Sequence, residues 1–143
     1  MQKKTNILDQ NISYNSVDDK NILLFIKAVK DGINFSYFTS IAKKSPFSMF
    51  EWSNFLHLSE RTLQRYKKEK RTFDSLQSEK ILQITLLYRF GIDVFGSKEK
   101  FHSWLEIENL SLGKTRPKEL LDNAFGINLL KDELTRIEHG TLA

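Results

Sequence analysis

A short basic helix, predicted between residues 59 and 71, constrains this chain more than any other feature. The stretch SERTLQRYKKEKR holds six cations and two anions. Its net charge of +4 equals the formal charge of the whole chain, so the residues outside it are neutral in sum. A basic stripe confined to one helix is typical of a surface that meets a polyanion. The plain alternative is a solvated face that covers a core, since charged helix faces are common.

The spacing within this stretch separates an inward face from an outward one. A hydroxyl at Ser59 can cap the helix, and Leu63 with Tyr66 can turn toward a core. Arg and Gln side chains can read base edges in a major groove, whereas Lys side chains suit phosphates. The residues expected to face DNA are Ser59, Glu60, Arg61, Gln64, Arg65, Lys67 and Lys68.

The residues just before this helix predict a second short helix and a tight turn. Ser48 and Glu51 form an S-x-x-E capping box, which satisfies backbone N–H groups at a helix start. A turn over 56–59 follows, a length that suits two helices crossing steeply. The pattern resembles the Xre-type (Cro/repressor-like) helix-turn-helix. That turn commonly has Gly where this chain has His57, so a positive φ there would carry some strain.

Length and composition limit the remaining possibilities. At 143 residues we expect one domain, or two small ones that share a core. The sequence has no Cys, which excludes a disulfide framework and thiolate chemistry and fits a cytoplasmic location. From the polar start we expect no signal peptide, and no apolar run reaches the ~18 residues of a membrane span.

The N-terminal half is expected to hold a loose arm over 1–16 and a helix-turn-helix domain over 17–73. Asp18 or Asp19 can cap a helix that runs through Lys30. Its predicted apolar face is Ile22, Phe25, Ile26 and Val29. The stretch 33–42 fits a strand by its alternation and also a helix capped by Asn34. We favour the helix, because helices surround the stretch and no partner strand is visible.

The C-terminal half, 74–143, is expected to be a second helical unit. An apolar helix is predicted over 75–95, capped by Asp74 and Gln77, interrupted at Gly91 and closed at Gly96. It is apolar around most of its circumference, which indicates either the central core or a dimer interface. Beyond it we expect a short helix after Ser97, a loop over 108–116, a helix from Pro117 that Gly126 stops, and a last helix with Ile127, Leu130, Leu134 and Ile137 inward. The fold class is all-α.

Over residues 59–142 the chain closely resembles the Xre/MbcA/ParS-type antitoxins of type II toxin–antitoxin modules. The features that carry the resemblance are SERTLQR (59–65), VFG (94–96), Trp104-Leu105, Asn109, Leu112-Gly113, Pro117, Leu120-Leu121, Gly126 and RIEHG (136–140). One departure is Thr115-Arg116-Pro117, because the family usually has Thr directly before Pro. Residues 17–58 fit more loosely, and 1–16 do not fit.

The resemblance implies an antitoxin with two binding functions. The N-terminal half would bind operator DNA and repress its own operon, and the C-terminal half would bind the cognate toxin and dimerise. The toxin would commonly be a RES-domain protein that consumes NAD. The antitoxin would block access to its active site and is itself expected to be no enzyme, with no cofactor and no small-molecule substrate.

A loop and a chain end can enter a concave active site, which a flat helix face cannot. The loop after the short helix and the C-terminal tail are therefore the expected toxin-binding elements, and buried Arg contacts are frequent anchors of interfaces. The expected toxin-binding residues are Leu110, Leu112, Lys114, Arg116, Arg136, Glu138, His139 and Gly140.

Catalytic and metal chemistry find little support in the sequence. The three His residues have no Cys partner and no H-x-x-x-H spacing, so no zinc site is expected. Leu112-Gly113-Lys114-Thr115 lacks the earlier glycine and the apolar strand of a P-loop. One other function stays open, a protein that sequesters a partner and whose helix-turn-helix is vestigial.

Overall fold

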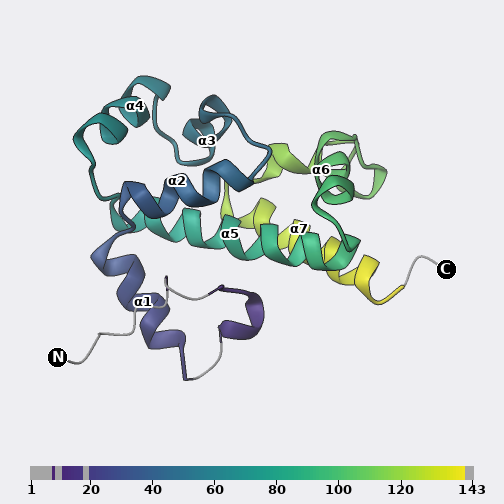
Figure 1. Cartoon of the computed structure of the whole chain (residues 1–143). Coiled ribbons are helices and arrows are strands. Elements are labelled where there is room, and N and C mark those ends of the chain that lie inside the picture. The colour runs from purple at the N-terminus through teal and green to yellow at the C-terminus, as the bar shows by residue number, and fades with distance from the viewer. Residues whose placement is uncertain (1–7, 9–10, 18–19, 141–143) are drawn as a thin grey trace.

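The computed structural model describes residues 8, 11–17 and 20–140 as an assembly of helices (Figure 1). The α-helices of this part are α1 (Ile22–Asp31), α2 (Phe35–Lys44), α3 (Met49–Phe55), α4 (Glu60–Glu69), α5 (Ser75–Phe95), α6 (Lys98–Glu106) and α7 (Ala124–Glu138). Short 3-10 helices are η2 (Tyr14–Ser16), η3 (Leu110–Leu112) and η4 (Pro117–Leu120). The described residues form no strand, only two isolated bridges. The predicted all-α class is confirmed.

Side-chain caps set the start of most of these helices, as the sequence predicts. The Ser48 hydroxyl accepts the Glu51 N–H at 3.1 Å, and the Glu51 carboxylate accepts the Ser48 N–H at 3.1 Å. Asp74 accepts the Gln77 N–H at 2.8 Å in the same way at the start of α5. Asn34 caps α2 through the Tyr37 N–H at 2.8 Å, so the helical alternative for 33–42 is correct.

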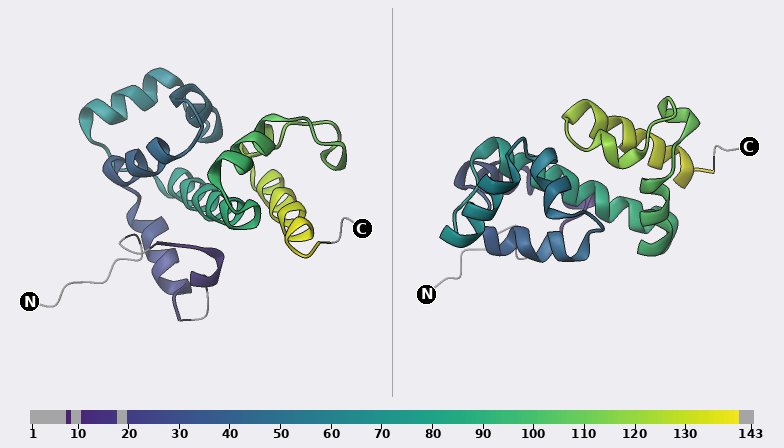
Figure 2. Two further views of the ribbon diagram at one scale, coloured as in Figure 1. Left: turned by 45° about the vertical axis from the view of Figure 1, so that its right-hand side comes forward. Right: turned by 90° about the horizontal axis from the view of Figure 1, so that it is seen from above.

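Helix α5 is the centre of the molecule (Figures 1 and 2). It packs against α1, α6, α7 and η2, and its Ile81, Ile84 and Leu87 are buried. Other elements of the same chain therefore cover most of the apolar surface of α5. Of the two alternatives for this helix, central core or dimer interface, the structure supports the central core. Leu76 at its first turn is an exception, with 75% of the side chain exposed. In the part of the chain that is described, no helix has the combination of length and hydropathy that a bilayer crossing requires.

An aromatic cluster forms the core beneath α3 and α4. The ring of Phe38 meets that of Trp52 at 5.1 Å and that of Phe73 at 5.2 Å between centroids, both edge to face. Such pairs add about 0.5–1.5 kcal/mol beyond the area they bury. The Phe73 N–H donates to the Ile33 carbonyl at 2.8 Å, which joins the α1–α2 turn to the α4–α5 turn. These contacts fix α4 on the rest of the molecule.

The N-terminal segment packs on the molecule over 11–17, where the sequence analysis expected a loose arm. Ile12 is buried, and the Tyr14 ring meets Phe90 of α5 edge to face at 5.5 Å. The Lys131 ammonium of α7 lies 4.1 Å from the centroid of the same ring. Burial raises the pKa of Tyr14, as expected of a phenol enclosed on these sides. The remainder of the expected arm lies outside the described residues.

Two glycines that were predicted to break helices lie inside them instead. Gly91 lies within α5, where a β-carbon would meet the ring of Phe101 at 2.1 Å. Gly126 lies in the first turn of α7, where a β-carbon would meet the Leu120 carbonyl oxygen at 2.0 Å. Both glycines are explained by a neighbour that must come close, which no local pattern reveals.

Two further predictions about helices are corrected. Helix α1 turns Phe25 and Ala28 inward, whereas Ile22 and Ile26 of the predicted apolar face are exposed. The predicted caps Asp18 and Asp19 lie outside the described residues. Pro117 begins a short 3-10 helix rather than an α-helix, and α7 begins later, where Asn123 accepts the Gly126 N–H at 2.8 Å.

Candidate functional site

The turn between α3 and α4 has the geometry that a helix-turn-helix needs. The Leu58 N–H donates to the Ser53 carbonyl at 2.9 Å, and the His57 N–H donates to the Asn54 carbonyl at 3.2 Å. His57 adopts φ 56°, the left-handed conformation expected where the family pattern has Gly. Ser53 is buried beside this turn, and only a small side chain lets two helices cross so closely.

Helix α4 presents the predicted stripe to solvent. Leu63 is fully buried, and Tyr66 packs on Phe73 with 5.6 Å between ring centroids. The predicted DNA-facing residues, Ser59, Glu60, Arg61, Gln64, Arg65, Lys67 and Lys68, are all exposed. Ser59 also caps the helix, accepting the Thr62 N–H at 3.0 Å. The α4 stripe, as we call these residues, is therefore held rigidly by an inward anchor and an N-terminal cap.

The cations of the α4 stripe have no ion-pair partner within the described part of the chain. Arg61, Arg65, Lys67 and Lys68 form no ion pair with any described carboxylate. Arg71, just beyond the helix, differs: it lies 3.6 Å from Glu69 and 5.1 Å from the Tyr66 ring centroid. Unpaired, exposed cations on one helix are the arrangement that phosphate contacts require.

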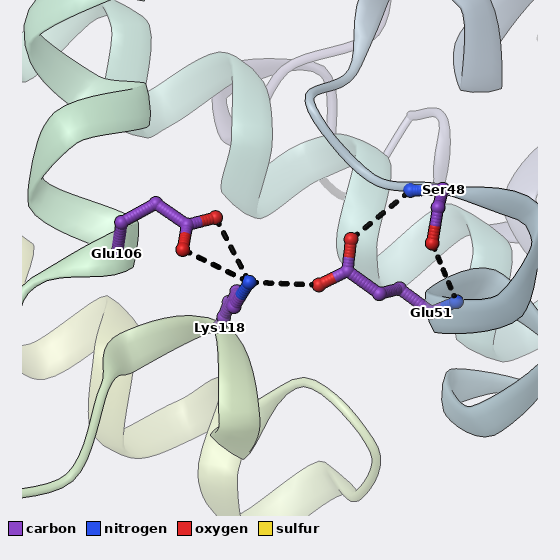
Figure 3. Close-up of polar contacts among 4 residues, drawn as sticks. All are labelled: Ser48, Glu51, Glu106 and Lys118. Atoms are coloured by element: carbon purple, nitrogen blue, oxygen red, sulfur yellow. Dashed lines mark hydrogen bonds and ion pairs between the residues drawn. The ribbon is translucent and has the colours of Figure 1, made fainter.

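A lysine joins this half of the molecule to the other (Figure 3). The Lys118 ammonium in η4 lies 2.9 Å from Glu51 of α3 and 2.9 Å from Glu106 of α6. Partial burial opposes ionisation of Glu51, but the Ser48 N–H and Lys118 outweigh it, so the pKa of Glu51 lies below its ordinary value. Both carboxylates raise the pKa of Lys118. The carboxylate of Glu51 therefore caps α3 and also forms an ion pair with Lys118 in the C-terminal half.

The loop over 109–116 is a closed, ordered turn. The Asn109 N–H donates to the Thr115 carbonyl at 3.1 Å, and the Lys114 N–H donates to the Asn109 carbonyl at 2.9 Å. Leu110 at the tip is 79% exposed, whereas Leu112 is 6% exposed. The predicted toxin-binding residue Leu112 is therefore a buried anchor of the loop in this structure. Lys114 and Arg116, two further residues expected to bind the toxin, are exposed.

The described part of the C-terminal tail is mostly exposed. Glu138 at the end of α7 and the following His139 and Gly140 face solvent, and 141–143 lie outside the described residues. Arg136 forms an ion pair with Glu133, a carboxylate that is only 4% exposed. Arg136 therefore has a structural task besides the predicted toxin contact. The loop and the tail lie at the same end of the molecule, beyond the C-terminal end of α5 (Figures 1 and 2).

The sequence pattern did not predict several exposed apolar side chains of the C-terminal half. Ile107, just before the loop, is 64% exposed. Phe125 and Leu129 on the outer face of α7 are 89% and 41% exposed. Their i, i+4 spacing opposite Ile127, Leu130 and Leu134 was the available signal. Large exposed apolar side chains commonly mark interaction sites.

The fold and these surfaces define a helix-turn-helix protein with an appended helical binding module. The chain matches two family models, the antitoxin Xre-like helix-turn-helix domain over residues 24–85 and the antitoxin Xre/MbcA/ParS C-terminal toxin-binding domain over residues 91–140. It therefore belongs to the Xre/MbcA/ParS antitoxin family, and the predicted resemblance is confirmed. The family indicates a regulatory protein. A comparison with curated proteins found no match.

Proposed function

We propose that this antitoxin binds operator DNA through the α4 stripe and blocks its cognate toxin with the loop 109–116 and the C-terminal tail. The observation that carries the proposal is the separation of the two surfaces. The stripe lies near the N-terminal end of α5, and the loop and tail lie near its C-terminal end (Figure 1). A helix of 21 residues is about 30 Å long. The two surfaces are therefore far enough apart for one chain to bind DNA and toxin at the same time.

The toxin contact uses an exposed apolar tip and nearby charges. Leu110 supplies the tip, and the charged or terminal residues are Lys114, Arg116, Arg136, Glu138, His139 and Gly140. Interfaces often combine an apolar anchor with Arg contacts of this kind. The partner is a RES-domain toxin that consumes NAD, as the family resemblance implies, and the antitoxin prevents substrate from reaching its active site in the cytoplasm.

DNA binding is preferred over a vestigial helix-turn-helix. A vestigial module would have no need for four cations that form no ion pair with a described residue, on a helix that is capped and anchored. The main objection to DNA binding was the absence of glycine at position 57 of the turn. His57 adopts the left-handed conformation without glycine, which favours a regular helix-turn-helix. The protein acts as a homodimer, because two-fold operators call for two-fold readers.

A growth assay with the toxin co-expressed tests the proposal for neutralisation. A chain that ends after Glu138 removes residues 139–143 of the tail but keeps the Arg136–Glu133 ion pair, which an earlier end at Thr135 would break. Combined with Leu110→Glu, this truncation should abolish protection of the cells. Lys68→Ala is the matched control, since it changes only the α4 stripe and should protect fully. Full protection by the truncated Leu110→Glu chain, with a native circular dichroism spectrum, would place the inhibitory surface elsewhere.

A further inference from the structure

A cavity of about 750 Å³ lies between α2, α5, the start of α6 and the N-terminal segment. Ligand sites in proteins have volumes of about 300–1,000 Å³ and often lie between packed units. Apolar side chains from three of these elements line part of it, namely Ile12, Ile41 and Ile92. The cavity is therefore large enough, and apolar enough on one side, for a small organic molecule.

Among the described residues, the charged side chains that line the cavity are all positive. Lys44 of α2, Arg89 of α5 and Lys98 of α6 line the cavity, and no Asp or Glu among the described residues does. None of the three cations forms an ion pair with a described carboxylate. Three cations that line one cavity from three helices repel one another, and an anion bound in the cavity would relieve that repulsion. The ligand that fits is thus negatively charged.

The hydroxyl groups that line the cavity differ in whether they can still donate a hydrogen bond to a ligand. Tyr88 donates to the Lys44 carbonyl at 2.8 Å and contacts His102 Nε2 at 2.6 Å, so its proton is already used. Ser40 donates to the Tyr37 carbonyl at 2.7 Å and Thr85 to the Ile81 carbonyl at 2.7 Å. Tyr37 differs, because its phenol donates to no described acceptor. Burial raises the pKa of Tyr37, so its hydroxyl stays a neutral donor.

This cavity lies on a different face of α2 from the α4 stripe. Lys67 of α4 borders a separate hollow with Phe38, Thr39 and Ala42 of α2. The α2 residues that line the large cavity are instead Tyr37, Ser40, Ile41 and Lys44. None of the residues around the large cavity belongs to α4, so its cations are not an extension of the DNA-facing stripe.

We propose that this cavity is a binding site for a small phosphate ester with an apolar or aromatic body. Arg89, Lys44 and Lys98 hold the phosphate, and the Tyr37 hydroxyl donates a further hydrogen bond to it. The body of the ligand rests on Ile12, Ile41 and Ile92. Because α2 belongs to the helix-turn-helix match and α6 to the toxin-binding match, the ligand bridges both modules. The site is independent of the toxin and DNA contacts proposed above.

Binding of 2-naphthyl phosphate to the full chain tests this site by isothermal titration and by amide chemical shifts. We expect saturable binding with shifts at Tyr37, Ile41 and Ile92. Arg89→Gln and Lys98→Gln should each weaken it at least about fivefold, because charge-assisted hydrogen bonds to phosphate are lost. Lys100→Gln is the matched control, an exposed lysine on α6 that does not line the cavity, and it should bind as the wild type does. Neutral 2-naphthol should bind much more weakly.

Several results would overturn the proposal. No heat and no shift at about 5 mM naphthyl phosphate would exclude a site of even millimolar affinity. An equal loss in Lys100→Gln would show that only the general positive charge matters. Shifts confined to α4, or full competition by a random DNA duplex, would show that the probe binds the DNA-facing stripe instead.

Discussion

The Nε2 of His57 lies 2.7 Å from the carbonyl oxygen of Asp122, 65 residues further along the chain. A carbonyl only accepts, so Nε2 carries the proton and the ring donates. His57 is the turn residue with a positive φ, and Asp122 directly precedes the cap of α7. Like the Lys118–Glu51 ion pair, this contact links the helix-turn-helix to the toxin-binding module.

Two substitutions of His57 distinguish the free-energy cost of strain in the turn from the loss of the hydrogen bond to Asp122. His57→Gly loses the hydrogen bond but accepts the left-handed conformation freely, whereas His57→Ala loses the bond and keeps the strain. We expect the Ala variant to be less stable than the Gly variant by about 1 kcal/mol in urea denaturation. Equal stability of the two variants would show that the turn is unstrained.

The ion pair of Glu51 should make stability depend on acid pH. The pKa of Glu51 is lowered in the folded chain from its ordinary 4.5, so its ionised form stabilises the fold above that value. Glu51→Gln should therefore cost about 1 kcal/mol of unfolding free energy at neutral pH. The difference should shrink as the pH falls through the lowered pKa and vanish below it. Denaturation series across this range measure it, with the more exposed Glu106→Gln as a control of smaller effect.

Gly126 should tolerate no side chain. A β-carbon there would meet the Leu120 carbonyl oxygen at 2.0 Å, and backbone cannot move aside as a side chain can. We expect Gly126→Ala to destabilise the protein by about 2–3 kcal/mol in thermal unfolding. Gly113→Ala is the comparison, because that glycine has φ +70° but open space around it, and it should cost about 1 kcal/mol. The reverse order would contradict the close approach at Gly126.

Within the α4 stripe, base reading and phosphate binding should separate. Arg61→Ala should lose about 1–3 kcal/mol on the operator and little on random DNA. Lys68→Ala should weaken both alike and reduce the slope of affinity against salt by about one. Fluorescence anisotropy with both duplexes at several salt concentrations measures this. Equal losses for Arg61→Ala on operator and random DNA would rule out base reading by Arg61.

The exposed apolar side chains of α7 should supply the dimer contact. Because α5 is covered within the chain, its surplus apolar face is no longer the candidate that the sequence suggested. Phe125 and Leu129, with Leu76 beside the start of α7, remain exposed. Light scattering at tens of micromolar should show twice the chain mass for the wild type and the single mass for Phe125→Asp. A single mass for the wild type would contradict dimerisation without DNA or toxin.

Local patterns predicted the helix starts well, because a cap is a contact within four residues. Ser48 with Glu51, Ser59, and Asp74 with Gln77 all act as their spacing indicates. The predicted outward residues of α4 are exposed because the inward side chains of Leu63 and Tyr66, three residues apart, fix the rotation of that helix.

Features that depend on distant residues could not be predicted. Gly91 and Gly126 look like helix stops locally, but Phe101 and Leu120 decide their place. The exposure of Phe125 depends on where α7 begins. The link from Lys118 to Glu51 spans 67 positions, and nothing in either local sequence announces it. Likewise, Leu112 turns inward because the closed loop requires an anchor.

Helix α5 has a consequence for how such antitoxins can be recombined. One family match ends at residue 85 and the other begins at residue 91, both within this single helix. The first turns of α5 belong to the helix-turn-helix match, and its last turn belongs to the toxin-binding match. A chimera that takes one module from a relative must therefore be joined inside α5 in helical register. It must also carry matching partners for Lys118 and His57, because otherwise the polar contacts between the two modules are lost.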